Sequence, residues 1–157
     1  MGKRFLVAID YSENAARAVD FVADTFSPSH EIILFSVIPS TAAVCGLESD
    51  TLIPQFTSQQ NAFCQVEDEK KIALKEALKR KKQVLLDAGF PEENIQVKTG
   101  LQKKGVARDI VAEAVRSRAD MVVMGRRGIS GFKEFFLGSI SQKVLQLSKE
   151  VSVLLVQ

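Results

Sequence analysis

The sequence has few of the residues that build metal and disulfide sites. It contains one histidine, His30, and two cysteines, Cys45 and Cys64, which lack the CxxC spacing of a zinc or redox motif. No cysteine or second histidine stands near His30 to complete a set of metal ligands. We therefore expect no metal centre, and we expect both cysteines to be reduced thiols in a cytoplasmic protein.

The sequence also lacks a long apolar run and a large excess of one charge. No run approaches the roughly 20 apolar residues that cross a bilayer, and Asp10 and Glu13 follow the first apolar stretch too closely for a signal peptide. The net charge of +2 does not indicate nucleic acid or an acidic membrane as the main partner. The 157 residues fit one domain of ordinary size, which we expect to span 1–157.

What the sequence does contain is an alternation of strand-like and helix-like patterns. Five segments are typical of β-strands: 4–10, 31–38, 94–100, 120–125 and 151–157. The patterns between them predict four helices: one capped by Ser12, one over about 60–88, one over 107–115 and one from about Gly138. Residues 40–59 lack periodicity, which predicts an irregular loop. The side chains predicted to face inward include Leu74, Leu78, Leu85, Ala107, Ile110, Ala114, Val115, Ile140, Val144 and Leu147.

This alternation predicts an α/β fold of one domain. Strands separated by helices of this length are usually parallel and joined by right-handed crossovers. The segment 94–100 is apolar only at alternate positions, so it belongs at a sheet edge. We predict an open, doubly wound sheet of five parallel strands in the order 3-2-1-4-5, with helices on both faces. Ligands of such sheets bind where the strand order reverses, here between the strands that end at Asp10 and Gly125.

A glycine-rich segment begins at this reversal. Four of the nine glycines fall within 17 residues: Gly125, Gly128, Gly131 and Gly138. Glycine allows the backbone to approach a ligand closely, and the free N–H groups of a helix beginning at Gly138 and Ser139 form a seat for phosphate. The segment is also locally basic, through Arg126, Arg127 and Lys133. There is no GxxxxGK[ST] sequence and no GxGxxG after the first strand, so neither a P-loop nor a dinucleotide site is indicated.

The spacing Gly125-x2-Gly128-x9-Gly138-Ser139 resembles the G-x2-G-x9-G-[ST] motif of ATP-binding universal stress proteins. The segments FLVAIDYSENAARAV, ILFSVIP, ADMVVMG and GSISQKVL resemble the strands and helices of that family in the same order. The resemblance implies that Asp10 lies near the ribose and phosphates and that the backbone of Val37 meets adenine. The phosphate-contacting residues that it implies are Gly125, Gly128, Gly138, Ser139 and Ile140.

Arg126 and Arg127 depart from the GSHG sequence of many relatives. They either strengthen phosphate binding or crowd the loop, and we include both among the candidate nucleotide-binding residues. Asp10 and Ser139 also have simpler interpretations, as the cap of a turn and of the last helix. The complete glycine motif favours the ligand for Asp10, and Ser139 can serve both roles, since a phosphate can replace or share the cap.

These features predict a regulatory protein that binds ATP, with or without Mg²⁺, and that acts without catalytic residues. The alternatives are a dimeric interaction module of the same fold that has lost nucleotide binding, and a slow Mg²⁺-dependent ATPase. The segment 151–157 has no lysine, proline or inward charge to protect a sheet edge. The resemblance implies that a homodimer forms through this segment, and an unidentified protein partner is expected to recognise the nucleotide-bound state.

Overall fold

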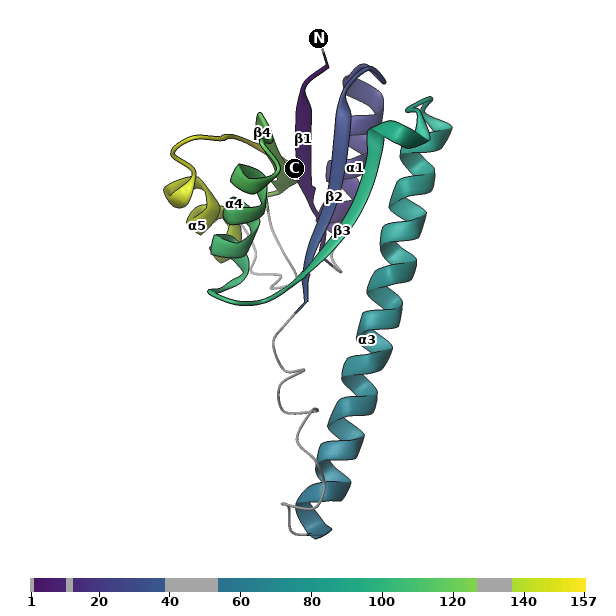
Figure 1. The fold of residues 1–157 in the computed structure, drawn as a ribbon, viewed down its shortest axis with the longest axis vertical. Helices are drawn as coiled ribbons and strands as arrows, with labels where there is room; N and C mark the ends of the chain where they lie inside the picture. Colours follow the sequence, from purple (N-terminus) through teal and green to yellow (C-terminus); the bar gives the residue numbers. More distant parts are fainter. Residues whose placement is uncertain (1, 11–12, 39–53, 127–136) are drawn as a thin grey trace.

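The computed structural model describes residues 2–10, 13–38, 54–126 and 137–157 of the chain, and its centre is a sheet of five parallel strands (Figure 1). The strands are β1 (Arg4–Ala8), β2 (Glu31–Ile38), β3 (Ile95–Leu101), β4 (Met121–Gly125) and β5 (Ser152–Val156). Their order is β3-β2-β1-β4-β5, and every neighbouring pair is parallel. The predicted strand order is confirmed, including the weak third strand at one edge.

Helices cover both faces of this sheet. The helices α1 (Glu13–Thr25) and α3 (Pro54–Asp87) pack on one face, and α4 (Val106–Arg116) and α5 (Ser139–Leu147) pack on the other. A short 3-10 helix, η2 (Glu92–Asn94), leads into β3. The helix before β3, α3, and the helix after it, α4, therefore lie on opposite faces of the sheet. The chain consequently adds β4 on the side of β1 away from β2, so the strand order reverses between β1 and β4.

The central strands are apolar throughout because both of their faces are buried. In β1 and just after it, Phe5, Val7 and Ile9 join the core under α1 and α3, whereas Leu6 and Ala8 join the core under α4 and α5. Successive side chains of a strand point to opposite faces, so a strand covered on both sides needs a continuous apolar run. This is why the strand positions were readable from the sequence.

The helix α3 is longer than predicted and projects beyond the sheet (Figure 1). It begins at Pro54 rather than near residue 60, so the prediction of an irregular loop over 40–59 is wrong for its last six residues. Proline is favoured in the first turn of a helix, where its missing N–H costs nothing. The buried side chains of α3 are Leu74, Leu78 and Leu85, as predicted. Among the described side chains between 64 and 73, none is buried.

Three other expectations about side chains are wrong. Val115 on α4 is 45% exposed and Ile140 on α5 is 36% exposed, although both were predicted to face inward. Both lie near a helix end, although their neighbours Ala114 and Ser141 are buried. Cys64 is disulfide-bonded in the structure, so it is not the reduced thiol that its spacing predicted. Cys45 lies outside the described residues.

A buried carboxylate fastens α4 to the edge strand β3. Glu113 on α4 is 4% exposed and accepts hydrogen bonds from Lys98 Nζ on β3 at 3.4 Å and from Ser117 Oγ at 2.8 Å. Arg116 Nε donates to its second oxygen at 2.9 Å. Burial by itself raises the pKa of Glu113, but the hydrogen bonds from Arg116, Ser117 and Lys98 outweigh burial and lower the pKa below its ordinary value. Glu113 is therefore an ionised, fully partnered group.

The described part of the chain contains no helix that is both long enough and apolar enough to cross a bilayer.

Candidate functional site

The carboxyl ends of three neighbouring strands bring together the first group of predicted site residues. β1 pairs with β2 on one side and with β4 on the other. Val37 lies near the end of β2, Gly125 ends β4, and Asp10 follows β1, whose pairing continues through a 2.8 Å hydrogen bond from Ile9 N to Phe35 O. Asp10 and Val37 are both half-buried. The structure thus places Asp10, Val37 and Gly125 together at the carboxyl ends of the strands.

A set of hydrogen bonds joins the end of β4 to the start of α5. Arg126 N donates to Val156 O on β5 at 2.7 Å, and Gly138 N donates to Arg126 O at 3.0 Å. Ser141 Oγ on α5 donates to Gly125 O at 3.0 Å. The chain therefore leaves β4 and returns to α5 at the same point, so Gly125, Arg126 and Gly138 are neighbours although 13 positions separate the two glycines. Arg127 and Gly128 lie outside the described residues.

The first turn of α5 presents backbone N–H groups at this point that no described side chain caps. Gly138 is the N-cap residue and Ser139 is the first helical residue, so the interpretation of Ser139 as the N-cap is wrong. Glycine has no side chain, and no described side chain caps this helix. Ser139 and Ile140 are exposed. N–H groups of a first turn that no side chain caps carry a partial positive charge and attract anions.

The first turn of α4 faces the same space. A hollow of about 280 Å³ lies between the two helices and is lined by Gly105, Val106, Ala107, Arg108, Ser139, Ile140 and Lys143. Gly105 is the N-cap of α4, with a φ of 117° that favours glycine, and no described side chain caps this helix either. Two helix starts therefore open into one hollow, on the face of the sheet covered by α4 and α5.

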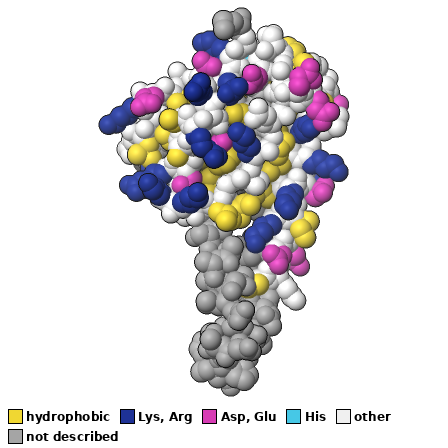
Figure 2. Space-filling model, viewed as in Figure 1, with side chains coloured by type: hydrophobic (Ala, Val, Ile, Leu, Met, Phe, Trp, Pro, Cys, Tyr) yellow, Lys and Arg dark blue, Asp and Glu magenta, His cyan; other side chains and the backbone are white. Residues whose placement is uncertain are grey.

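The lining of the hollow is basic. Arg108 and Lys143 contribute the charged side chains of the lining, and none of the described lining residues is acidic. Asp109, the acid nearest in sequence, accepts hydrogen bonds from the backbone N–H groups of Lys103 at 2.8 Å and Lys104 at 3.2 Å. Its carboxylate is thus engaged with the turn before α4. Figure 2 shows Lys and Arg side chains spread over the visible face of the molecule, with Asp and Glu side chains among them.

Sequence reasoning missed this second wall of the site. Lys103 and Lys104 are exposed, and the next residue, Gly105, lines the hollow. The available signal was a glycine, Gly105, directly before a helix-like pattern. Among the described residues, no three His, Cys, Asp or Glu side chains come together as a metal-binding group.

The whole chain, residues 1–157, matches the model of the Universal stress protein family. The chain belongs to this family. It is 30% identical over 153 residues to the universal stress protein YxiE of Bacillus subtilis (strain 168), across 94% of this chain and 95% of that protein. Its fold matches the solved structure of MJ0577, a universal stress protein of Methanocaldococcus jannaschii, with a TM-score of 0.71 and 25% identity over 99% of this chain and 96% of that one.

Two other solved structures that this universal stress protein resembles are nucleotide complexes. One is a universal stress protein in complex with cAMP, with a TM-score of 0.64 and 20% identity over 99% of this chain and 97% of that one. The other, from Archaeoglobus fulgidus, is in complex with dAMP, with a TM-score of 0.61 and 18% identity over 100% and 98% of the two chains. At these identities the likeness to this chain is one of fold.

Proposed function

We propose that this universal stress protein is a regulatory protein that binds ATP, with or without Mg²⁺, at the carboxyl edge of its sheet. The observation that carries the proposal is the 3.0 Å hydrogen bond from Gly138 N to Arg126 O. It holds the end of β4 against the first turn of α5, which no described side chain caps and where phosphate is favoured. The cAMP and dAMP complexes of relatives support a nucleotide as the ligand.

Each part of the nucleotide has a proposed set of contacts. The backbone N–H groups at Ser139 and Ile140 and the hydroxyl of Ser139 bind phosphate, and Gly125 leaves room for the ligand beside β4. Asp10 lies toward the ribose and phosphates and supplies a carboxylate oxygen when Mg²⁺ accompanies ATP. The backbone of Val37 lies toward adenine. Arg126, and Arg127 and Gly128 beyond the described residues, complete the proposed set.

The activity that we propose is binding, and the nucleotide-bound form is the one that a partner protein recognises. A cytoplasmic location stays a prediction from the sequence.

The test is calorimetry with ATP on nucleotide-free wild-type protein and on Ser139→Asp. An acid in the first turn of α5 favours the helix by about 0.3–1 kcal/mol, so the melting temperature should hold or rise. The same charge repels phosphate, by about 4 kcal/mol at 4 Å for an effective dielectric constant of 20. We therefore expect ATP affinity to fall by about 1,000-fold without loss of stability.

The matched control is Gln146→Asp, which adds the same charge to an exposed position near the other end of α5. It should leave ATP affinity within about twofold of wild type, because solvent screens a charge two helical turns away. Wild-type protein that gives no heat with ATP would reject the proposal in favour of an interaction module without nucleotide. Ser139→Asp that binds ATP as well as wild type would place the phosphates elsewhere.

We also propose that the protein forms a homodimer through β5. This strand is at the sheet edge, and its side chains from Val153 to Leu155 are only half-buried. Ser152 N donates to Asp120 O, and Val156 O accepts from Arg126 N. The backbone groups of alternate residues of β5 therefore point toward the neighbouring strand β4. The backbone groups of Val153 and Leu155 consequently point to the open edge. An unprotected edge of this kind invites pairing with a second copy around a two-fold axis.

A further inference from the structure

We propose that Arg108 and Lys143 make this site select nucleotides by the length of their phosphate chain, so that ATP binds more tightly than AMP. This inference rests on the proposed function, because it assumes that the first phosphate is held at the start of α5. It assigns a role to two residues that lie outside the glycine motif. It also gives the hollow between α4 and α5 a defined occupant, the β- and γ-phosphates.

The hollow continues directly from the proposed phosphate seat. Ser139 and Ile140 belong both to that seat and to the lining of the hollow. Lys143 follows Ser139 by four residues and Ile140 by three, and residues at these spacings share one face of a helix. A phosphate chain that extends from the first turn of α5 into the hollow therefore runs toward Lys143.

The opposite wall adds a second cation. Arg108 lies in the first turn of α4, and it lines the hollow together with Gly105, Val106 and Ala107. A guanidinium group binds phosphate oxygens through several N–H donors at once. Arg108 and Lys143 approach the hollow from separate helices, so a group that enters between those helices meets positive charge on both sides.

The size and charge of the hollow fit part of a nucleotide. Its volume of about 280 Å³ is below the about 300–1,000 Å³ that is typical of a whole small-molecule site. The described lining residues carry two positive side chains and no negative one. Asp109 accepts hydrogen bonds from the N–H groups of Lys103 and Lys104 and is not among the lining residues. Such a hollow favours a highly charged phosphate chain over the base or ribose.

The experiment measures ATP, ADP and AMP affinities by calorimetry on the full chain, for wild type and for Arg108→Gln/Lys143→Gln. Both side chains are exposed, so the double variant should fold, which its melting curve checks. We expect the ratio of AMP to ATP dissociation constants to fall about tenfold in the double variant. AMP affinity should change less than about twofold. In wild type the ratio should also fall as salt is raised, because salt screens exposed charges.

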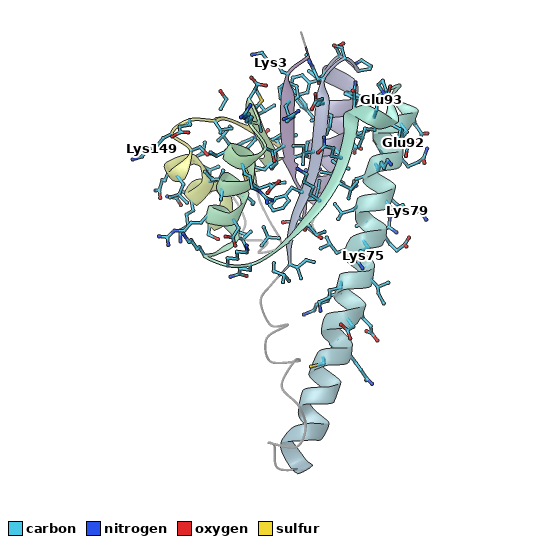
Figure 3. All side chains as sticks on the ribbon, viewed as in Figure 1. Lys3, Lys75, Lys79, Glu92, Glu93 and Lys149 are labelled. Atoms are coloured by element: carbon cyan, nitrogen blue, oxygen red, sulfur yellow. The ribbon has the colours of Figure 1, made fainter. Side chains whose placement is uncertain are left out.

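A matched control carries the same change in net charge elsewhere. Lys3→Gln/Lys149→Gln removes two exposed lysines that do not line the hollow and that are labelled in Figure 3. The control should keep the wild-type ratio.

Three results would overturn the inference, and they separate it from the proposed function. If the nucleotides bind but Arg108→Gln/Lys143→Gln keeps the wild-type ratio, the selectivity claim fails and the ATP site stands. If the double variant loses AMP and ATP affinity equally, the two cations bind the first phosphate and do not select chain length. If wild type binds none of the three nucleotides, the proposed function itself fails.

Discussion

At the scale of single residues, two carboxylates on α4 determine much of the local electrostatics. Asp109 caps the N–H groups of Lys103 and Lys104, and Glu113 binds Lys98, Arg116 and Ser117. Both carboxylates are engaged in structural contacts within and beside α4. The net effect is that α4 is anchored toward its carboxyl end by Glu113, while its first turn offers positive charge to the hollow.

The role of Glu113 leads to a prediction about acid stability. Its lowered pKa means that its contribution to the free energy of unfolding is fully present above its ordinary pKa of 4.5 and is lost as pH falls through the lower folded-state pKa. Glu113→Gln should therefore reduce stability by about 1–3 kcal/mol at pH 7. Wild type and variant should converge in acid.

Urea unfolding at pH 7 and at about pH 3 measures this difference. The control is Glu76→Gln, which neutralises an exposed carboxylate on another helix, α3, and should change stability by less than about 0.5 kcal/mol. A difference between wild type and Glu113→Gln that is equal at both pH values would contradict the assigned ionisation.

The candidate site was predictable at this scale where residues sit at strand ends. Asp10 and Gly125 were placed together at the carboxyl ends of neighbouring strands, because parallel strands end together and the strand order was readable, whereas Val37 came only from the family resemblance. Arg108 and Lys143 were not predicted as site residues, because a basic residue in an amphipathic helix normally indicates a solvated face. Arg108 and Lys143 differ from ordinary solvated residues only because the starts of α4 and α5 come together in the fold. Glu113 was missed for a similar reason, since its partner Lys98 comes from a different element.

At the scale of elements, α3 divides into a packed half and a projecting half (Figure 1). Leu74, Leu78 and Leu85 bury the carboxyl half against the sheet. Before Leu74 the helix runs past the sheet, and Ile72 is 63% exposed. A helix shows apolar periodicity only where one face is buried. The projecting half buries none of its described side chains, so the pattern did not reveal where α3 begins.

The division of α3 predicts unequal costs for two similar truncations. Leu78→Ala removes a side chain that is 1% exposed, so it should lower stability by about 2–5 kcal/mol. Ile72→Ala, on the projecting half, should change stability by no more than about 0.5 kcal/mol. Urea unfolding measures both variants. Comparable losses would show that Ile72 is covered in solution and that the projecting half is not free.

At the scale of the whole molecule, the fold was predicted because each level of pattern agreed. The buried strands are continuous apolar runs, the edge strand β3 alternates, and the helices between them fix the parallel order. The hollow was not predicted, because it forms where residues 105–108 and 139–143 meet across the fold. Contacts between segments so distant in sequence leave no local pattern in either one.

The proposed dimer makes a prediction that also belongs to the whole molecule. Val153→Pro removes a backbone N–H that points to the open edge of β5 and leaves the pairing with β4 in place. It should convert the dimer to a monomer by light scattering. Val153→Ala loses much of the same side chain but keeps the N–H, so it should remain dimeric. A monomeric wild type, or a dimeric Val153→Pro variant, would refute the interface.

The central claim is that the first turn of α5 holds the phosphates of ATP, and a crystal structure with saturating ATP tests it most directly. The account predicts phosphate oxygens within hydrogen-bonding distance of the N–H groups of Ser139 and Ile140, with the chain running toward Arg108 and Lys143. Phosphates bound elsewhere on the molecule, or a carboxyl edge without nucleotide at saturating ATP, would contradict it.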